Sequence, residues 1–305
     1  MKAKSIKGKS PEEIKNALTE SLSDGFKPTL AIVFLSVKQD REAISRLLDE
    51  KGIQIFGATT AGEFIDGEIE DGSIVVMLLD INPAYFKIEF LETGNSSVYE
   101  MAKKLGAAGK NTFVRSAFII ASGWINIDGE EIIKGIEDGY DEVPTIFGGM
   151  AGDDISLTGP IVFTNDKYSI LGLVALVIDE SRVNVNGIAT CGWKPVGVTK
   201  TVTKSFGKII YTIDNQPAFD LVIKYLGLNK EDMSSVTDSI VNFGANYPLQ
   251  LERDEAPPVM RTAQLGNLVD RSIICAGNVQ QGTKFRFSVP PDLRSSIQSS
   301  MNARI

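Results

Sequence analysis

A strand–helix–strand pattern occurs twice in the first 190 residues, and this repetition constrains the fold more than any other feature of the chain. In the first copy, an apolar run at 31–36 precedes a helical pattern at 40–52 and a second apolar run ending in Ile55-Phe56-Gly57. In the second copy, the same parts lie at 117–122, 129–139 and 144–148. Both copies continue to Ala-Gly and an acidic residue, so one supersecondary unit is used twice.

Further strand patterns follow each copy, and the predicted order of elements is β-α-β-β-β. These strand patterns lie at 73–79 and 85–91 after the first copy, and at 161–163, 170–178 and 182–189 after the second. Simple β-α alternation would predict a doubly wound parallel sheet, whereas consecutive strands favour mixed sheets with helices on one face. We therefore predict an α/β fold of duplicated β-α-β-β-β units, at 28–110 and 115–190, whose mixed sheets pack as a layered sandwich with outer helices.

Local signals place further helices and strands. Ser10 and Pro11 are typical of a helix start, and Ile14, Leu18 and Leu22 then follow at intervals of four residues. In the C-terminal part we expect a hairpin of 198–206 and 208–213, a helix at 216–226, a short strand at 259–263, and a strand pair of 271–276 and 283–288. The stretch 229–258 is polar and irregular, which is typical of a lid or a domain seam.

Composition excludes several functional classes. The chain has no histidine, which excludes Ser-His-Asp and Cys-His catalysis, His-liganded zinc and His-ligated haem. Its net charge of −8 has the wrong sign for binding nucleic acid or an anionic membrane. Its 2 cysteines suit a reducing compartment. The longest apolar run, 169–178, is about half the length that crosses a bilayer, so we expect a cytoplasmic chain without direct membrane insertion.

The glycine-rich turns that end the two copies carry the strongest local signal for a binding site. Glu63, Asp153 and Asp154 follow strands there, and α/β proteins place ligands at strand ends. The turns lack the lysine of a phosphate-binding loop and the Gly-x-Gly-x-x-Gly spacing of a dinucleotide site. A purely structural interpretation fits equally well: the glycines permit tight turns, and the acids cap neighbouring amides.

Two residues of the C-terminal part are further candidates. Trp193 could form an aromatic wall of a ligand site or fill the core. Arg261 could bind a ligand carboxylate with its planar guanidinium, or form an ion pair at the surface or at a domain interface. Cys191 is expected to be a buried structural thiol, because only Lys194 could lower its pKa.

Several motifs in order resemble the FIST domain family. The paired turns Phe56-Gly-Ala-Thr-Thr-Ala-Gly-Glu-Phe64 and Phe147-Gly-Gly-Met-Ala-Gly-Asp-Asp154 are similar to its paired signatures. The match continues through Gly192-Trp-Lys-Pro-Val-Gly197, Val202-Thr-Lys-Ser-Phe-Gly207, Gln216-Pro-Ala-Phe-Asp220, Tyr247-Pro248, Arg261 and Ala276-Gly-Asn-Val-Gln-Gln-Gly282. The resemblance covers nearly the whole chain, from 28 to 295.

This resemblance implies an intracellular sensory module that is attached to signalling outputs and binds small ligands such as amino acids. It implies an N-terminal family half at 1–215 and a C-terminal half at 216–305. Compared with the family, we expect the C-terminal half to be without the usual last unit, as in a short member or a fragment. Some similar proteins hold haem through a histidine; this chain has none, and we expect no cofactor.

We therefore predict a sensory module that binds an amino acid or a similar zwitterion and is not an enzyme. The predicted site comprises Gly62, Glu63, Gly148, Gly149, Gly152, Asp153, Asp154, Trp193 and Arg261. Backbone amides of the turns would bind the ligand carboxylate, and the acids its amino group. Expected partners are the ligand, a signalling protein or domain and a second copy of the chain. The alternatives are a hydrolase or lyase that uses the three carboxylates with a divalent metal, and a protein-interaction scaffold without a small ligand.

Overall fold

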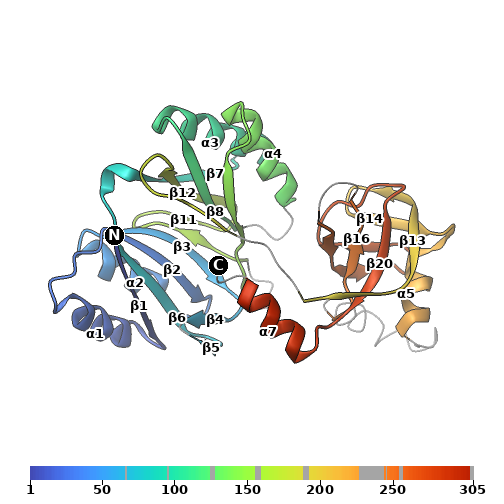
Figure 1. Ribbon diagram of the computed structural model, residues 1–305, viewed down its shortest axis with the longest axis horizontal. Helices are drawn as coiled ribbons and strands as arrows, with labels where there is room; N and C mark the ends of the chain where they lie inside the picture. The colour runs from blue at the N-terminus through green and yellow to red at the C-terminus, as the bar shows by residue number, and fades with distance from the viewer. Residues whose placement is uncertain are drawn as a thin grey trace. The chain divides into compact units, whose positions relative to one another are not determined.

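The computed structural model describes residues 1–65, 67–94, 96–123, 128–154, 159–187, 192–226, 244, 246–253 and 257–302. The chain divides into two compact units, Met1–Asn186 (unit 1) and Gly187–Ile305 (unit 2). In Figure 1, unit 1 begins in blue and unit 2 ends in red. Among the described residues, three hydrophobic core clusters lie within unit 1 and one lies within unit 2. The family halves at 1–215 and 216–305 stay a prediction.

Within the described residues, two mixed sheets form most of unit 1. The first sheet has the order β1-β6-β2-β3-β10-β11, and the second has the order β7-β12-β8-β9. Their strands are β1 (Lys2–Gly8), β2 (Leu30–Ser36), β3 (Gln54–Thr60), β6 (Ile74–Asp80), β7 (Phe86–Glu92), β8 (Ser116–Ser122), β9 (Thr145–Met150), β10 (Val162–Phe163), β11 (Tyr168–Ser169) and β12 (Gly172–Asp179). In both sheets one pair is parallel, β2 with β3 and β8 with β9, and its neighbours are antiparallel. The order β1-β6-β2-β3 thus corresponds strand by strand to β7-β12-β8-β9.

Helices connect the strands at equivalent places. In the first half of unit 1, α1 (Pro11–Leu22) joins β1 to β2, and α2 (Arg41–Asp49) joins β2 to β3. In the second half, α3 (Val98–Thr112) joins β7 to β8, and α4 (Gly129–Tyr140) joins β8 to β9. The predicted start of α1 is confirmed, because the Ser10 hydroxyl accepts a hydrogen bond from the Glu13 amide at 3.3 Å.

The sheets and helices of unit 1 form layers, as the alternation of side chains along a strand requires. Along β2, Val33 packs with the helices α1 and α2, whereas Leu30 faces the second sheet. In the second sheet, Val174 joins that inter-sheet core, and its neighbour Ala175 packs toward α3 and α4. The predicted layered α/β fold with outer helices is confirmed.

Some strand assignments made from the sequence are wrong. The sequence pattern predicts that the strand at 85–91 belongs to the first copy, but β7 lies at the edge of the second sheet and pairs with β12. It predicts that the strand at 161–163 belongs to the second copy, but β10 pairs antiparallel with β3 in the first sheet. The described part of 182–189 contains no strand. Side-chain alternation identifies a strand but carries no information about its partner, which explains these errors.

Unit 2 contains a curled sheet of order β17-β16-β20-β13-β14-β19-β18, with β15 paired to β14. Its elements are β13 (Lys194–Phe206), β14 (Ile209–Ile213), β15 (Gln216–Pro217), α5 (Ala218–Leu226), β16 (Leu249–Leu251), β17 (Val259–Arg261), β18 (Ala263–Gly266), β19 (Ile273–Cys275), β20 (Lys284–Val289) and α7 (Leu293–Asn302). Only Thr262 separates β17 from β18, which end the order, so the sheet curls until its edges meet. Phe219 of α5 is buried in the same core as Phe285 of β20.

The hairpin predicted about Gly207 is confirmed by the pairing of β13 with β14. The strand pair predicted from 271–276 and 283–288 is wrong: β19 pairs with β14 and β18, and β20 pairs with β13 and β16. Across the described parts of the chain, no helix combines the length and apolarity that a membrane crossing requires.

Candidate functional site

The two glycine-rich turns of unit 1 pack directly on each other. The Gly152 amide donates a hydrogen bond to the Thr59 carbonyl oxygen at 2.8 Å, and the Thr59 hydroxyl donates to the Gly152 carbonyl oxygen at 2.7 Å. A Cβ atom on Gly152 would lie 2.8 Å from the backbone nitrogen of Ala61, so only glycine permits this contact. The polar backbone of Gly152 is therefore satisfied by the first turn.

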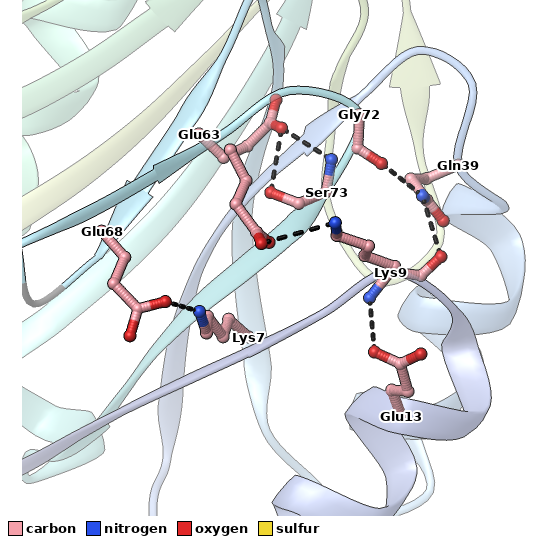
Figure 2. A network of polar contacts seen from close by, with 9 residues as sticks. Lys7, Lys9, Glu13, Gln39, Glu63, Glu68, Gly72 and Ser73 are labelled. Atoms are coloured by element: carbon pink, nitrogen blue, oxygen red, sulfur yellow. Dashed lines mark hydrogen bonds and ion pairs between the residues drawn. The ribbon is translucent and has the colours of Figure 1, made fainter.

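Glu63 is buried at the start of a small hairpin formed by β4 (Glu63–Ile65) and β5 (Glu68–Glu70), with 2% of its surface exposed. The Thr60 hydroxyl donates to Glu63 Oε1 at 2.6 Å. The backbone amide and the hydroxyl of Ser73 donate to Oε2 at 2.8 and 3.1 Å (Figure 2). These bonds join the start of the hairpin to the residue before β6.

Ion pairs also join the hairpin to β1 and to the residue that follows its end. Lys7 pairs with Glu68, whose carboxylate raises the pKa of Lys7, and Lys9 Nζ lies 3.4 Å from a Glu70 carboxylate oxygen. The Gln39 side-chain amide donates to the carbonyl oxygen of Gly72 at 2.7 Å, and to that of Lys9 at 3.1 Å (Figure 2). The segment from 63 to 73 is thus held by contacts to several parts of the first sheet and its connections.

The acids of the second turn bind protein donors as well. Asp153 is buried, and its Oδ2 accepts a hydrogen bond from the Gly159 amide at 3.2 Å. Asp154, which has a left-handed φ of 54°, accepts from the Ser36 hydroxyl and lies 3.5 Å from Lys38 Nζ. Among the described residues, no group of three or more potential metal ligands comes together.

Two further predicted residues of unit 1, Gly148 and Gly149, lie along β9. Gly148 is in close contact with the Ile120 carbonyl of β8, where a side chain would not fit. Gly149 is exposed and has open space around its Cα atom.

Trp193 and Arg261 belong to unit 2. Trp193 is half-buried immediately before β13. Arg261 ends β17, where its Nε donates to the Asn278 carbonyl oxygen and its Nη1 to that of Met260, both at 3.1 Å. A ligand-binding role for these two residues stays a prediction, as does the joint site of all nine residues.

The structure describes one of the two cysteines. Cys191 lies outside the described residues. Cys275 is buried in unit 2, and burial raises the pKa of its thiol to about 12, although the nearby Arg261 charge opposes this shift.

A pocket of about 460 Å³ lies in unit 1 where the β4–β5 hairpin contacts β1, β2 and β6. The residues that line it are Ser5, Ile32, Phe34, Thr60, Gly62, Glu63, Phe64, Ile65, Val75, Val76 and Met77. Two of them, Gly62 and Glu63, belong to the predicted site. Sequence reasoning missed the apolar walls, because the alternating apolar residues of β2 are equally typical of core. Phe64 also lines the pocket and has 77% of its surface accessible, an exposure that the structure shows and the sequence does not.

Much of the chain is similar to a known protein family. Residues 29–216 match the FIST N domain. Among curated proteins, none matches the sequence. Because the family match spans more than half of the 305 residues, the chain belongs to the FIST family of sensory and signal-transduction domains.

Proposed function

We propose that this chain is a sensory module that binds a small ligand and transmits its presence to a signalling protein or domain. The observation that carries the proposal is the pocket beside Gly62 and Glu63, in a chain of a sensory family. The pocket volume is within the range of about 300–1,000 Å³ that is usual for small-molecule sites. In this proposal the module acts in the cytoplasm and performs no catalysis.

The proposed ligand is an amino acid or a similar zwitterion. Glu63 provides a carboxylate for its amino group, and the apolar walls suit an apolar side chain. Of the glycines predicted to bind the ligand carboxylate, Gly152 already bonds to Thr59 through its amide, whereas Gly149 is exposed. In this proposal the two acids of the second turn stabilise the fold. Asp153 accepts a hydrogen bond from Gly159, and Asp154 contacts Ser36 and Lys38.

A thermal-shift screen of the full chain with amino acids, nucleotides and divalent metals tests this proposal. A ligand that binds only the folded protein raises the unfolding temperature in proportion to RT ln(1 + [L]/Kd). We expect a rise with at least one amino acid. Metal-dependent turnover that is lost in Asp153→Asn would instead favour the hydrolase or lyase. An empty screen combined with a captured protein partner would favour the scaffold.

A further inference from the structure

We infer that the pocket between the β4–β5 hairpin and the first sheet is a site for an organic cation, namely an amine with an apolar body. This inference rests on the proposed function, because it takes the pocket as the ligand site. It goes further in naming the group that is recognised. Three properties of the pocket support this inference. They are its apolar walls, its negative charge and an unused hydrogen-bond acceptor position on one oxygen of the Glu63 carboxylate.

The walls suit an apolar body. Ile32 and Phe34 of β2 contribute the face of the first sheet that also packs on the second sheet. Met77 of β6 and Phe64 of the hairpin complete this apolar lining, and both are accessible, at 45% and 77% of their surfaces. An aliphatic or aromatic group that covered them would remove apolar surface from water, at about 25 cal/mol per Å².

The charge of the pocket is negative. Of the described residues that line it, Glu63 alone carries a charge. The donors that Glu63 binds in the described structure, Thr60 and Ser73, are neutral. The lysines next to the hairpin pair with other carboxylates: Lys7 with Glu68 (Figure 2) and Lys9 with Glu70. A buried carboxylate without a cationic partner favours a ligand that brings one.

The Glu63 carboxylate has room for one more donor. A carboxylate offers about four acceptor positions, two on each oxygen. Oε2 accepts two hydrogen bonds from Ser73, whereas Oε1 accepts one from Thr60, which itself lines the pocket. An ammonium group that reached Oε1 from the pocket would therefore find an acceptor position that no donor among the described residues occupies.

The same lining disfavours a ligand carboxylate. No lysine or arginine is found among the described residues of the pocket wall, so an anionic group would lie beside Glu63 without a cationic partner. An amine should therefore bind more tightly than the amino acid of the same body. This expectation separates the inference from the zwitterion of the proposed function.

Titration calorimetry of the full chain with three probes of one body tests the inference. The probes are phenethylamine (a cation), 2-phenylethanol (neutral) and phenylalanine (a zwitterion). We expect phenethylamine to bind about tenfold more tightly than either of the others. Equal or tighter binding of 2-phenylethanol would overturn the inference. Tighter binding of phenylalanine would overturn it while upholding the proposed function. If no probe binds, the inference fails, and the wider thermal-shift screen then decides the proposed function by itself.

Single substitutions test whether phenethylamine binds in this pocket and whether the charge of Glu63 selects it. Glu63→Gln keeps an acceptor for Ser73 and removes the charge, so the preference for the amine over the alcohol should disappear.

Met77→Trp, on a half-exposed side chain, should fill the pocket and weaken phenethylamine binding by about tenfold. Ile133→Trp is the control, because Ile133 is 44% exposed on α4 and lies outside the pocket. If Met77→Trp, with unchanged circular dichroism, binds phenethylamine like the parent protein, the site is not this pocket.

Discussion

Gly152 shows how a single absent side chain fixes the contact between the two turns. A methyl group there would approach the Ala61 backbone nitrogen to 2.8 Å, and backbone on both sides cannot rotate away. We expect Gly152→Ala to lower the free energy of unfolding by about 1–3 kcal/mol in urea titrations. Gly149→Ala is the matched control, since nothing lies within 4 Å of its added carbon. Equal stability of the two variants would show that the turns can separate at little cost.

Cys275 is expected to be unreactive in the folded protein. Burial raises its pKa to about 12 from the model-peptide value of 9.0, and the thiolate is the reactive form. In a Cys191→Ser background, a thiol reagent at pH 8 should label Cys275 only after denaturant is added. Because the unfolded chain releases this proton at a lower pH, the thiol also makes stability fall as pH rises from 9.0 to about 12. Rapid labelling of the native protein would contradict this burial.

At the scale of elements, α3 and α4 approach each other through glycines. A Cβ atom on Gly139 would overlap the Lys103 carbonyl oxygen, and one on Gly135 would lie 2.6 Å from that of Tyr99. We expect Gly139→Ala to destabilise the protein by about 1–3 kcal/mol. This value is the net effect, after the gain of about 1 kcal/mol in helix propensity has been subtracted from the steric cost. Gly129→Ala, at the start of the same helix with open space around it, should be neutral in the same thermal unfolding measurement.

Helices and strands whose signals lie within one short segment could be predicted from the sequence. The strands with which they pair in a sheet could not. Ser10 begins α1 because its hydroxyl binds an amide three residues away, and such a signal lies within one segment. The placement of β7 and β10 depends on pairing with β12 and β3, which are distant in the chain. The β4–β5 hairpin, with strands of three residues each, is too short for side-chain alternation to reveal.

At the scale of the whole molecule, the core clusters divide as the two units do. The clusters of unit 1 contain residues from Ile6 to Ile178, and the cluster of unit 2 contains residues from Val202 to Phe287. We therefore expect a fragment of residues 1–186 to fold alone, with one cooperative transition in urea followed by circular dichroism. A fragment that aggregates or unfolds without cooperativity would show that unit 1 depends on the rest of the chain.

The sequence predicts residues of the candidate site only where an acidic side chain follows a glycine-rich turn at the end of a strand. Gly62 and Glu63 follow a strand end, and both line the pocket. Ile32, Phe34 and Met77 come from strands that are neighbours only in the folded sheet, because β6 pairs with β2 across more than thirty intervening residues. Their apolar character is the same in a filled core and in a pocket wall, so no sequence pattern distinguishes the two.

Binding of a small ligand in the pocket beside Glu63 can be observed residue by residue. The measurement is a phenethylamine titration of the full chain followed in methyl-labelled NMR spectra. We expect saturable shifts of the methyl groups of Ile32, Ile65, Val75, Val76 and Met77, and unchanged signals for Ile133 and Ile210. Saturable shifts centred on other residues, with these five signals unmoved, would contradict binding in this pocket.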